Sequence, residues 1–173
     1  MGKKVIRFGL NTKDINKAIR ELEQYKRDFQ KKVDNYRKRI AEEIAVNASL
    51  NFGSALMEYR IREGPRKPDV QVRVDDRGSI AVVVADGEDA VWCEFGAGVY
   101  HNGPAGTSPH PKGSELGFTI GSYGYGFGRL TAWGYYEDGN LVITRGTPAS
   151  MPMYNAAQEV MKKAIEIARE VFQ

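Results

Sequence analysis

The N-terminal third of the chain is one long stretch without a helix-breaking residue. Between Gly9 and Gly53 there is no glycine and no proline, and apolar residues recur mostly three or four positions apart. These residues are Ile15, Ile19, Leu22, Phe29, Val33, Tyr36, Ile40 and Ile44. The spacing places them on one face of an α-helix. Asn11 or Thr12 can cap its first turn, where the negative charge of Asp14 is favourable.

The length of this predicted helix limits what the chain can fold into. From residue 11 to residue 51 it would extend about 60 Å, at about 1.5 Å per residue. A chain of 173 residues is expected to form one domain with its own core. Such a domain is too small to cover a helix of this length. We therefore expect part of the helix to project and to need a partner.

The middle of the chain predicts antiparallel strands. Val70, Val72 and Val74 alternate with polar residues, and a turn at 75–78 leads into a second strand at 80–85. A third strand is predicted at 90–95. A second hairpin is predicted from 130–137 and 141–144, around residues 138–140. These strands would form an antiparallel sheet of about four to six strands.

The chain is expected to end in an amphipathic helix that packs on this sheet. Ser150 is a plausible cap, and Pro152 suits the first turn. Its inner face would consist of Tyr154, Ala157, Met161, Ala164, Ile167, Ala168 and Val171. The fold class is therefore α+β, in a single domain spanning 1–173. Within it we expect a long helix at 11–58, a sheet at 69–146 with a glycine-rich loop at 96–128, and a C-terminal helix at 150–172.

Charge is distributed unevenly along the chain. Residues 1–67 hold 17 Lys and Arg against 9 Asp and Glu, a balance of +8, whereas residues 68–173 hold 8 against 13, a balance of −5. The asymmetry is compatible with nucleic-acid contact, or with copies that stack basic face on acidic face. It is equally compatible with a solvated helix surface.

The composition gives no sign of a membrane or secreted protein. No apolar run approaches the roughly 18 residues that span a bilayer, and the N-terminus lacks the apolar core of a signal peptide. The single cysteine, Cys93, has no partner for an internal disulfide. A reducing compartment such as the bacterial cytoplasm is therefore expected.

The loop at 96–128 is rich in glycine with interleaved aromatic residues. Tyr123, Tyr125 and Phe127 have the character of side chains that stack on nucleic-acid bases. However, the loop and its edge offer only Lys112 and Arg129 to meet phosphates. We favour a protein-contact loop that becomes ordered on assembly.

No catalytic, cofactor or metal site is predicted. Cys93, Glu94, His101 and His110 are four nominal metal ligands, but their spacing lacks the close pairs typical of metal sites. Cys93 with a histidine could form a thiol nucleophile and its base, whereas a thiol in an apolar strand is usually inert. Glu94 is expected either to pair with an arginine such as Arg145 or to lie exposed on the outer face of its strand.

Two segments carry a family resemblance. Val91–Gly98 reads VWCEFGAG, and Thr147–Met153 reads TPASMPM and is followed by Ala156 and Ala157. In this order, they resemble the signatures of the neck, head–tail joining or tail-completion proteins of long-tailed bacteriophages and prophages, which are minor tail components. The resemblance in order and architecture covers nearly the whole chain. It implies a long N-terminal helix, a curved antiparallel sheet and a C-terminal helix.

The resemblance also implies a structural role and no enzymatic activity. Copies of the chain would form a ring, hexameric in the virion, that docks on connector or head-closure proteins and on tail proteins. The implied location is the virion neck or tail, and the host bacterial cytoplasm during assembly, with passing contact with DNA and none with membranes. The residues expected to make interactions are Glu94, Phe95, Gly96, Gly98, Tyr123, Tyr125, Phe127 and Arg145.

Two other classes of function remain open from the residues alone. One is a nucleic-acid-binding module that uses the basic N-terminal helix, with binding that weakens steeply as salt is added. Its basic residues would be Lys26, Arg27, Lys31, Lys32, Arg37, Lys38 and Arg39, interrupted by Asp28 and Asp34. The other is a small thiol enzyme or hydrolase that uses Cys93, His101 and His110.

Overall fold

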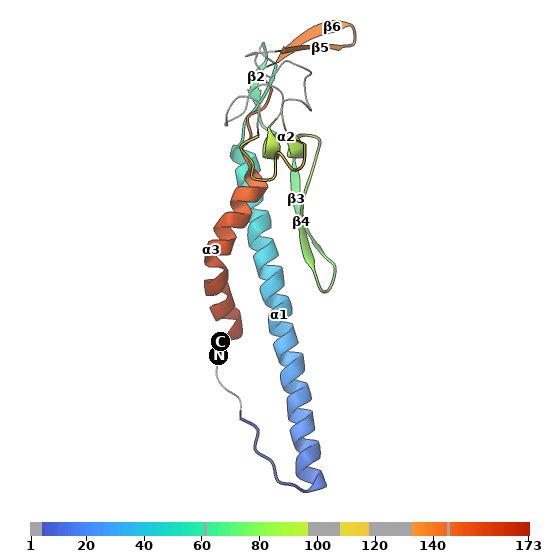
Figure 1. Cartoon of the computed structure of the whole chain (residues 1–173), viewed down its shortest axis with the longest axis vertical. Coiled ribbons are helices and arrows are strands. Elements are labelled where there is room, and N and C mark those ends of the chain that lie inside the picture. Colours follow the sequence, from blue (N-terminus) through green and yellow to red (C-terminus); the bar gives the residue numbers. More distant parts are fainter. Residues whose placement is uncertain (1–4, 61, 97–107, 118–132, 145) are drawn as a thin grey trace.

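The computed structural model describes residues 5–60, 62–96, 108–117, 133–144 and 146–173. They form an elongated molecule built along one helix, α1 (Thr12–Ser54), which has 43 residues and a length of about 65 Å (Figure 1). The backbone N–H of Asp14 donates to Asn11 Oδ1 at 2.9 Å, so Asn11 is the cap. The predicted long helix and its starting point are confirmed, whereas its predicted end at residue 58 is wrong, because α1 ends at Ser54 and a strand begins at Met57.

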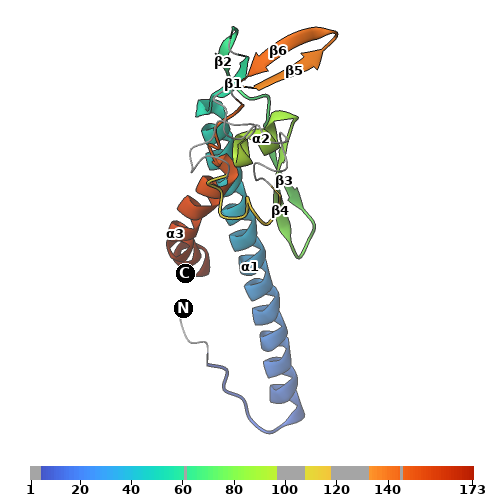
Figure 2. The same cartoon turned by 45° about the horizontal axis from the view of Figure 1, so that its top comes forward.

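The strands form three separate antiparallel hairpins among the described residues. The pairs are β1 (Met57–Arg60) with β2 (Gly64–Arg66), β3 (Gln71–Asp76) with β4 (Ala81–Asp86), and β5 (Trp133–Glu137) with β6 (Asn140–Thr144). The two hairpins predicted from the sequence are confirmed. The prediction of one sheet of four to six strands is wrong, because β3–β4 packs along α1 whereas the other two hairpins lie beyond the C-terminal end of that helix (Figures 1 and 2).

The third predicted strand is also wrong, because this segment forms a short helix, α2 (Asp89–Phe95). A short apolar run cannot be assigned to strand or helix from periodicity alone. Asp89, the first residue of α2, accepts hydrogen bonds from residues outside the helix. Arg66 donates to its two carboxylate oxygens at 2.7 and 2.8 Å, and the N–H of Asp69 donates at 2.9 Å. These contacts come from residues 20 and 23 positions away, so they are invisible in the local sequence.

The contacts of Asp89 predict an acid-sensitive contribution to stability. Burial alone would raise its pKa, but the hydrogen bonds from Arg66 and from the Asp69 N–H, with the Arg66 charge, lower the pKa overall. The contribution is therefore complete above the unfolded pKa of about 3.9 and is lost as pH falls through the lower folded pKa. We expect Asp89→Asn to lower the urea midpoint at pH 7. The difference from wild type should shrink below about pH 4, and a constant difference down to pH 2 would contradict this reading.

The last helix, α3 (Pro152–Phe172), packs antiparallel along α1 (Figure 1). The prediction that it packs on the sheet is therefore wrong. Ala156, Val160 and Ile167 of α3 are buried, as are Ala41 and Ala48 of α1. Several of these side chains are small, so the two helix backbones can approach closely.

The buried face of α3 agrees in part with the predicted one: Ile167 is buried as expected, and the other predicted residues except Met161 are partly buried. Met161, predicted to face inward, is 63% exposed, whereas the adjacent Val160 is fully buried. The Tyr36 hydroxyl on α1 donates to the carbonyl of Ala164 on α3 at 3.2 Å, which adds a polar contact between the two helices. Pro152 occupies the first turn as predicted.

A small core forms where α1 and α2 end and α3 begins. Phe52, Ala55 and Cys93 are buried together there, and Val70, Val72, Ala85 and Met153 pack against them. The core thus joins the three helices and the hairpin β3–β4. No helix in the described ranges is both long enough and apolar enough to cross a membrane.

The N-terminal part of α1 extends past the end of α3 (Figure 1). The Phe172 ring near the end of α3 contacts Phe29 and Tyr36, with ring centroids 5.8 and 6.1 Å apart. Beyond this contact, Ile15, Ile19 and Leu22 are exposed. The expectation that this domain cannot cover its long helix is confirmed.

Candidate interaction site

The two segments that carry the family resemblance meet in space. The carbonyl of Cys93 accepts the N–H groups of Ser150 at 2.9 Å and of Met151 at 3.4 Å. Gly96 follows with a φ of 80°, and a Cβ at this position would lie 3.1 Å from the Ala149 nitrogen and 3.1 Å from the Thr147 oxygen. The end of α2 and the entry to α3 are thus one packed junction.

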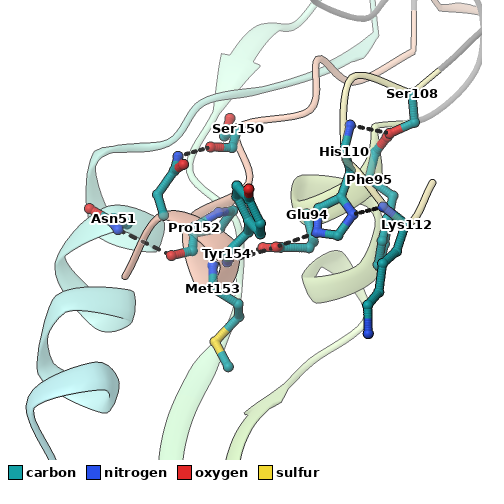
Figure 3. Close-up of polar contacts among 11 residues, drawn as sticks. Asn51, Glu94, Phe95, Ser108, His110, Lys112, Ser150, Pro152, Met153 and Tyr154 are labelled. Carbon is teal, nitrogen blue, oxygen red and sulfur yellow. Dashed lines mark hydrogen bonds and ion pairs between the residues drawn. The ribbon is translucent and has the colours of Figure 1, made fainter. Parts of the chain in front are cut away.

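The Glu94 side chain caps the start of α3 at this junction. Its side chain is buried, and its Oε2 and Oε1 accept the N–H groups of Met153 at 2.8 Å and Tyr154 at 2.9 Å (Figure 3). The first N–H groups of a helix have no partner within the helix and mark the positive end of its dipole. A carboxylate satisfies both requirements.

This geometry corrects two predictions. Ser150 is not the cap, because the N-cap position is Met151, which has a left-handed φ of 52° and no capping side-chain hydrogen bond. Glu94 does not lie exposed on the outer face of a strand, because it is 7% exposed and belongs to α2. Its alternative predicted partner, Arg145, lies outside the described residues.

His110 completes the surroundings of Glu94. Its Nε2 lies 3.3 Å from Glu94 Oε1, and its Nδ1 accepts the N–H of Lys112 at 3.0 Å (Figure 3). The ring also packs against Phe95 and Tyr154, with centroids 4.4 and 5.3 Å apart.

The segment 108–117 of the glycine-rich loop is therefore anchored to this junction. The Ser108 hydroxyl donates to the carbonyl of Phe95 at 2.5 Å and accepts the N–H of His110 at 3.2 Å. Sequence reasoning treated His110 only as a nominal metal ligand or base and missed this packing role. No periodicity or motif in the loop signals it.

The predicted interaction residues divide into two groups. Glu94, Phe95 and Gly96 lie together at the junction. Gly98, Tyr123, Tyr125, Phe127 and Arg145 lie outside the described residues, as does His101.

The chemistry available at the junction is that of a buried structural contact. Burial raises the pKa of the Cys93 thiol to about 11, so the reactive thiolate is scarce at neutral pH. Both ring nitrogens of His110 are engaged, one with Glu94 and one with the backbone. Within the described part of the chain, no three His, Cys, Asp or Glu residues are grouped so that they could hold a metal ion.

The burial of Cys93 predicts very slow thiol labelling. At pH 7.4, Ellman's reagent should react with the folded chain at least about 100-fold more slowly than with the chain in urea, because the thiol is both buried and protonated. Ser79→Cys is a matched control, since Ser79 lies in an exposed turn. The variant should release one equivalent of dye rapidly and the second only on unfolding. Rapid labelling of native Cys93 would contradict its burial.

Comparison with models of protein families, with curated proteins and with solved structures finds no match to this chain.

Proposed function

We propose that this chain is a structural virion protein of a tailed phage or prophage, forming a ring at the head–tail junction as a neck or tail-completion protein. The two resemblance segments support this proposal, since they lie far apart in the sequence and form one contact unit around Glu94. A ring would arise by homo-oligomerisation and would dock on connector and tail proteins. The role requires binding surfaces and no reaction centre.

The observation that carries the proposal is the distribution of exposed apolar side chains. Ile15, Ile19 and Leu22 lie exposed on the projecting part of α1. Tyr136 and Leu141 lie exposed on the hairpin β5–β6, at the opposite end of the molecule (Figure 1). Exposed apolar clusters mark interaction surfaces. A subunit with such a surface at each end of an elongated body suits an assembly.

Ion pairs within the chain weaken the nucleic-acid alternative. Arg37 and Lys38 both pair with Asp76 on β3, at 3.2 and 3.0 Å. The hydrogen bond from Lys38 lowers the pKa of Asp76, so its charge persists. Arg39 pairs with Glu170 on α3 at 2.6 Å. Lys32 also donates to the carbonyl of Gln173 at 2.6 Å, so four of the seven basic residues that would meet phosphates hold α1 against its neighbours.

The proposal is tested by deleting the gene from its phage or prophage and examining the particles by electron microscopy. A head–tail joining role predicts separate filled heads and finished tails, whereas a tail-completion role predicts tails of abnormal length. Expression of the wild-type chain in trans should restore joined particles. Normal infectious particles after deletion would refute the structural role. Filter binding of the purified chain to DNA at rising salt would then test the alternative.

A further inference from the structure

One face of the hairpin β5–β6 is apolar and exposed. Tyr136 lies opposite Leu141, and Gly134 lies opposite Ile143. Opposed residues share a face, as do residues two apart along one strand. Tyr136, Leu141 and Ile143 therefore share a face, on which they are 76%, 58% and 47% exposed. We call this group the hairpin face.

The opposite face of the same hairpin is turned toward the protein. Val142 and Thr144 on it are 9% and 5% exposed. Among the described side chains of the hairpin, the buried ones thus lie on this face. Because Gly134 has no side chain, Leu141 can lie over it on the exposed side. A Cβ at position 134 would be only 3.0 Å from Leu141 Cδ1.

A second exposed apolar group lies on the projecting part of α1. Ile15, Ile19 and Leu22 are separated by four and three residues, so they line one side of the helix, and they are 38%, 48% and 55% exposed. We call them the helix stripe. The stripe is about 10 Å long from its first to its last Cα. The hairpin face is about 7 Å long and about 5 Å wide between Cα atoms, so it fits within the length of the stripe.

The hairpin face and the helix stripe lie at opposite ends of the molecule in both views (Figures 1 and 2). They therefore cannot meet within one chain. They can meet between two copies arranged head to tail. Such a contact joins different surfaces on the two partners, and its repetition produces a closed ring or an open filament.

Charge favours the hairpin face over a second helix as the occupant of the stripe. Residues 133–144 contain two acidic residues and no Lys or Arg, a balance of −2. Residues 12–32 contain seven Lys and Arg against four Asp and Glu, a balance of +3. Hairpin on helix thus brings opposite charges together, whereas pairing two helix stripes would oppose two positive surfaces.

We propose that the hairpin face of one copy packs on the helix stripe of a second copy. This inference rests on the homo-oligomerisation in the proposed function and identifies the two surfaces that make it. The partner is another copy of this chain, and the contact is heterologous. Each subunit uses one hairpin face and one helix stripe.

Complementation between two variants tests the inference. The hairpin variant carries Leu141→Lys and Ile143→Lys, and the helix variant carries Ile19→Glu and Leu22→Glu. All four residues are exposed, so circular dichroism should show unchanged folding. In sedimentation velocity, wild type should form oligomers as concentration rises, whereas each variant alone should remain monomeric. An equimolar mixture should form a one-to-one dimer and nothing larger, since only one intact surface of each kind remains.

The controls and contrary outcomes are distinct. Leu50→Glu on α1 and Ile165→Lys on α3 change exposed apolar residues outside both surfaces and should leave self-association unchanged. A hairpin variant that still oligomerises, together with a helix variant that does not, would indicate helix–helix pairing and overturn the inference. A wild type that stays monomeric at millimolar concentration would also overturn it. In either case the deletion phenotype decides the proposed virion role separately.

Discussion

Replacing Glu94 by alanine should lower the free energy of unfolding by about 3 kcal/mol. The substitution removes the acceptor of two backbone N–H groups at the start of α3 and leaves His110 Nε2 without its partner. Glu94 and His110 are buried and the two backbone N–H groups are part-buried, so water can replace the carboxylate only incompletely. Urea unfolding at pH 7, followed by circular dichroism, measures the loss.

Glu94→Gln is the matched control, because it keeps the shape and one acceptor oxygen but removes the negative charge at the helix N-terminus. Its expected loss is smaller, about 1 to 2 kcal/mol. A double-mutant cycle with His110→Ala should show coupling between the two positions, since their side chains are in contact. If Glu94→Ala costs less than about 0.5 kcal/mol, the range of ordinary surface changes, Glu94 does not cap α3 as described.

Replacing Gly96 by alanine should destabilise the fold by a similar amount, about 3 kcal/mol. Two costs combine at this position. A φ of 80° is unfavourable for a residue with a Cβ, and that Cβ would press on the backbone of Thr147 and Ala149 at 3.1 Å. The backbone on both sides is fixed by the hydrogen bonds from Ser150 and Met151 to the Cys93 carbonyl, so relief is difficult.

Gly78→Ala separates these two costs. Gly78 has nearly the same φ, 79°, but a Cβ there would have no atom within 4 Å. It should therefore show only the backbone cost, about 1 kcal/mol. Thermal or urea unfolding of both variants gives the comparison. Equal losses at the two glycines would mean that the close approach between Gly96 and the entry to α3 contributes nothing.

The site was only partly predictable because its contacts join distant segments. The sequence indicated that Glu94, Phe95 and Gly96 matter, as neighbours in one motif. It placed them on a strand, since a short apolar run does not distinguish strand from helix. Their partners are Ser108 and His110 from the loop and Tyr154 from α3. The spacing of residues within a segment does not predict contacts between segments so far apart in the sequence.

What the sequence alone determined are the features that depend on neighbouring residues. The absence of glycine and proline, the regular apolar spacing and the Asn11 cap define α1, and alternating valines with a glycine turn define β3–β4. These follow from steric and hydrogen-bonding preferences within a few positions of the chain.

Tertiary structure alone decided how these elements combine. It kept the hairpins separate, placed α3 on α1, turned 89–95 into a helix and supplied the cap of α3 from Glu94. The physical reason is that burial, and the partners of backbone N–H groups, depend on contacts between segments that are distant in the sequence. The order of residues does not show that Arg66 reaches Asp89. Nor does it show that the small alanines of α1 and α3 allow these two helices to approach.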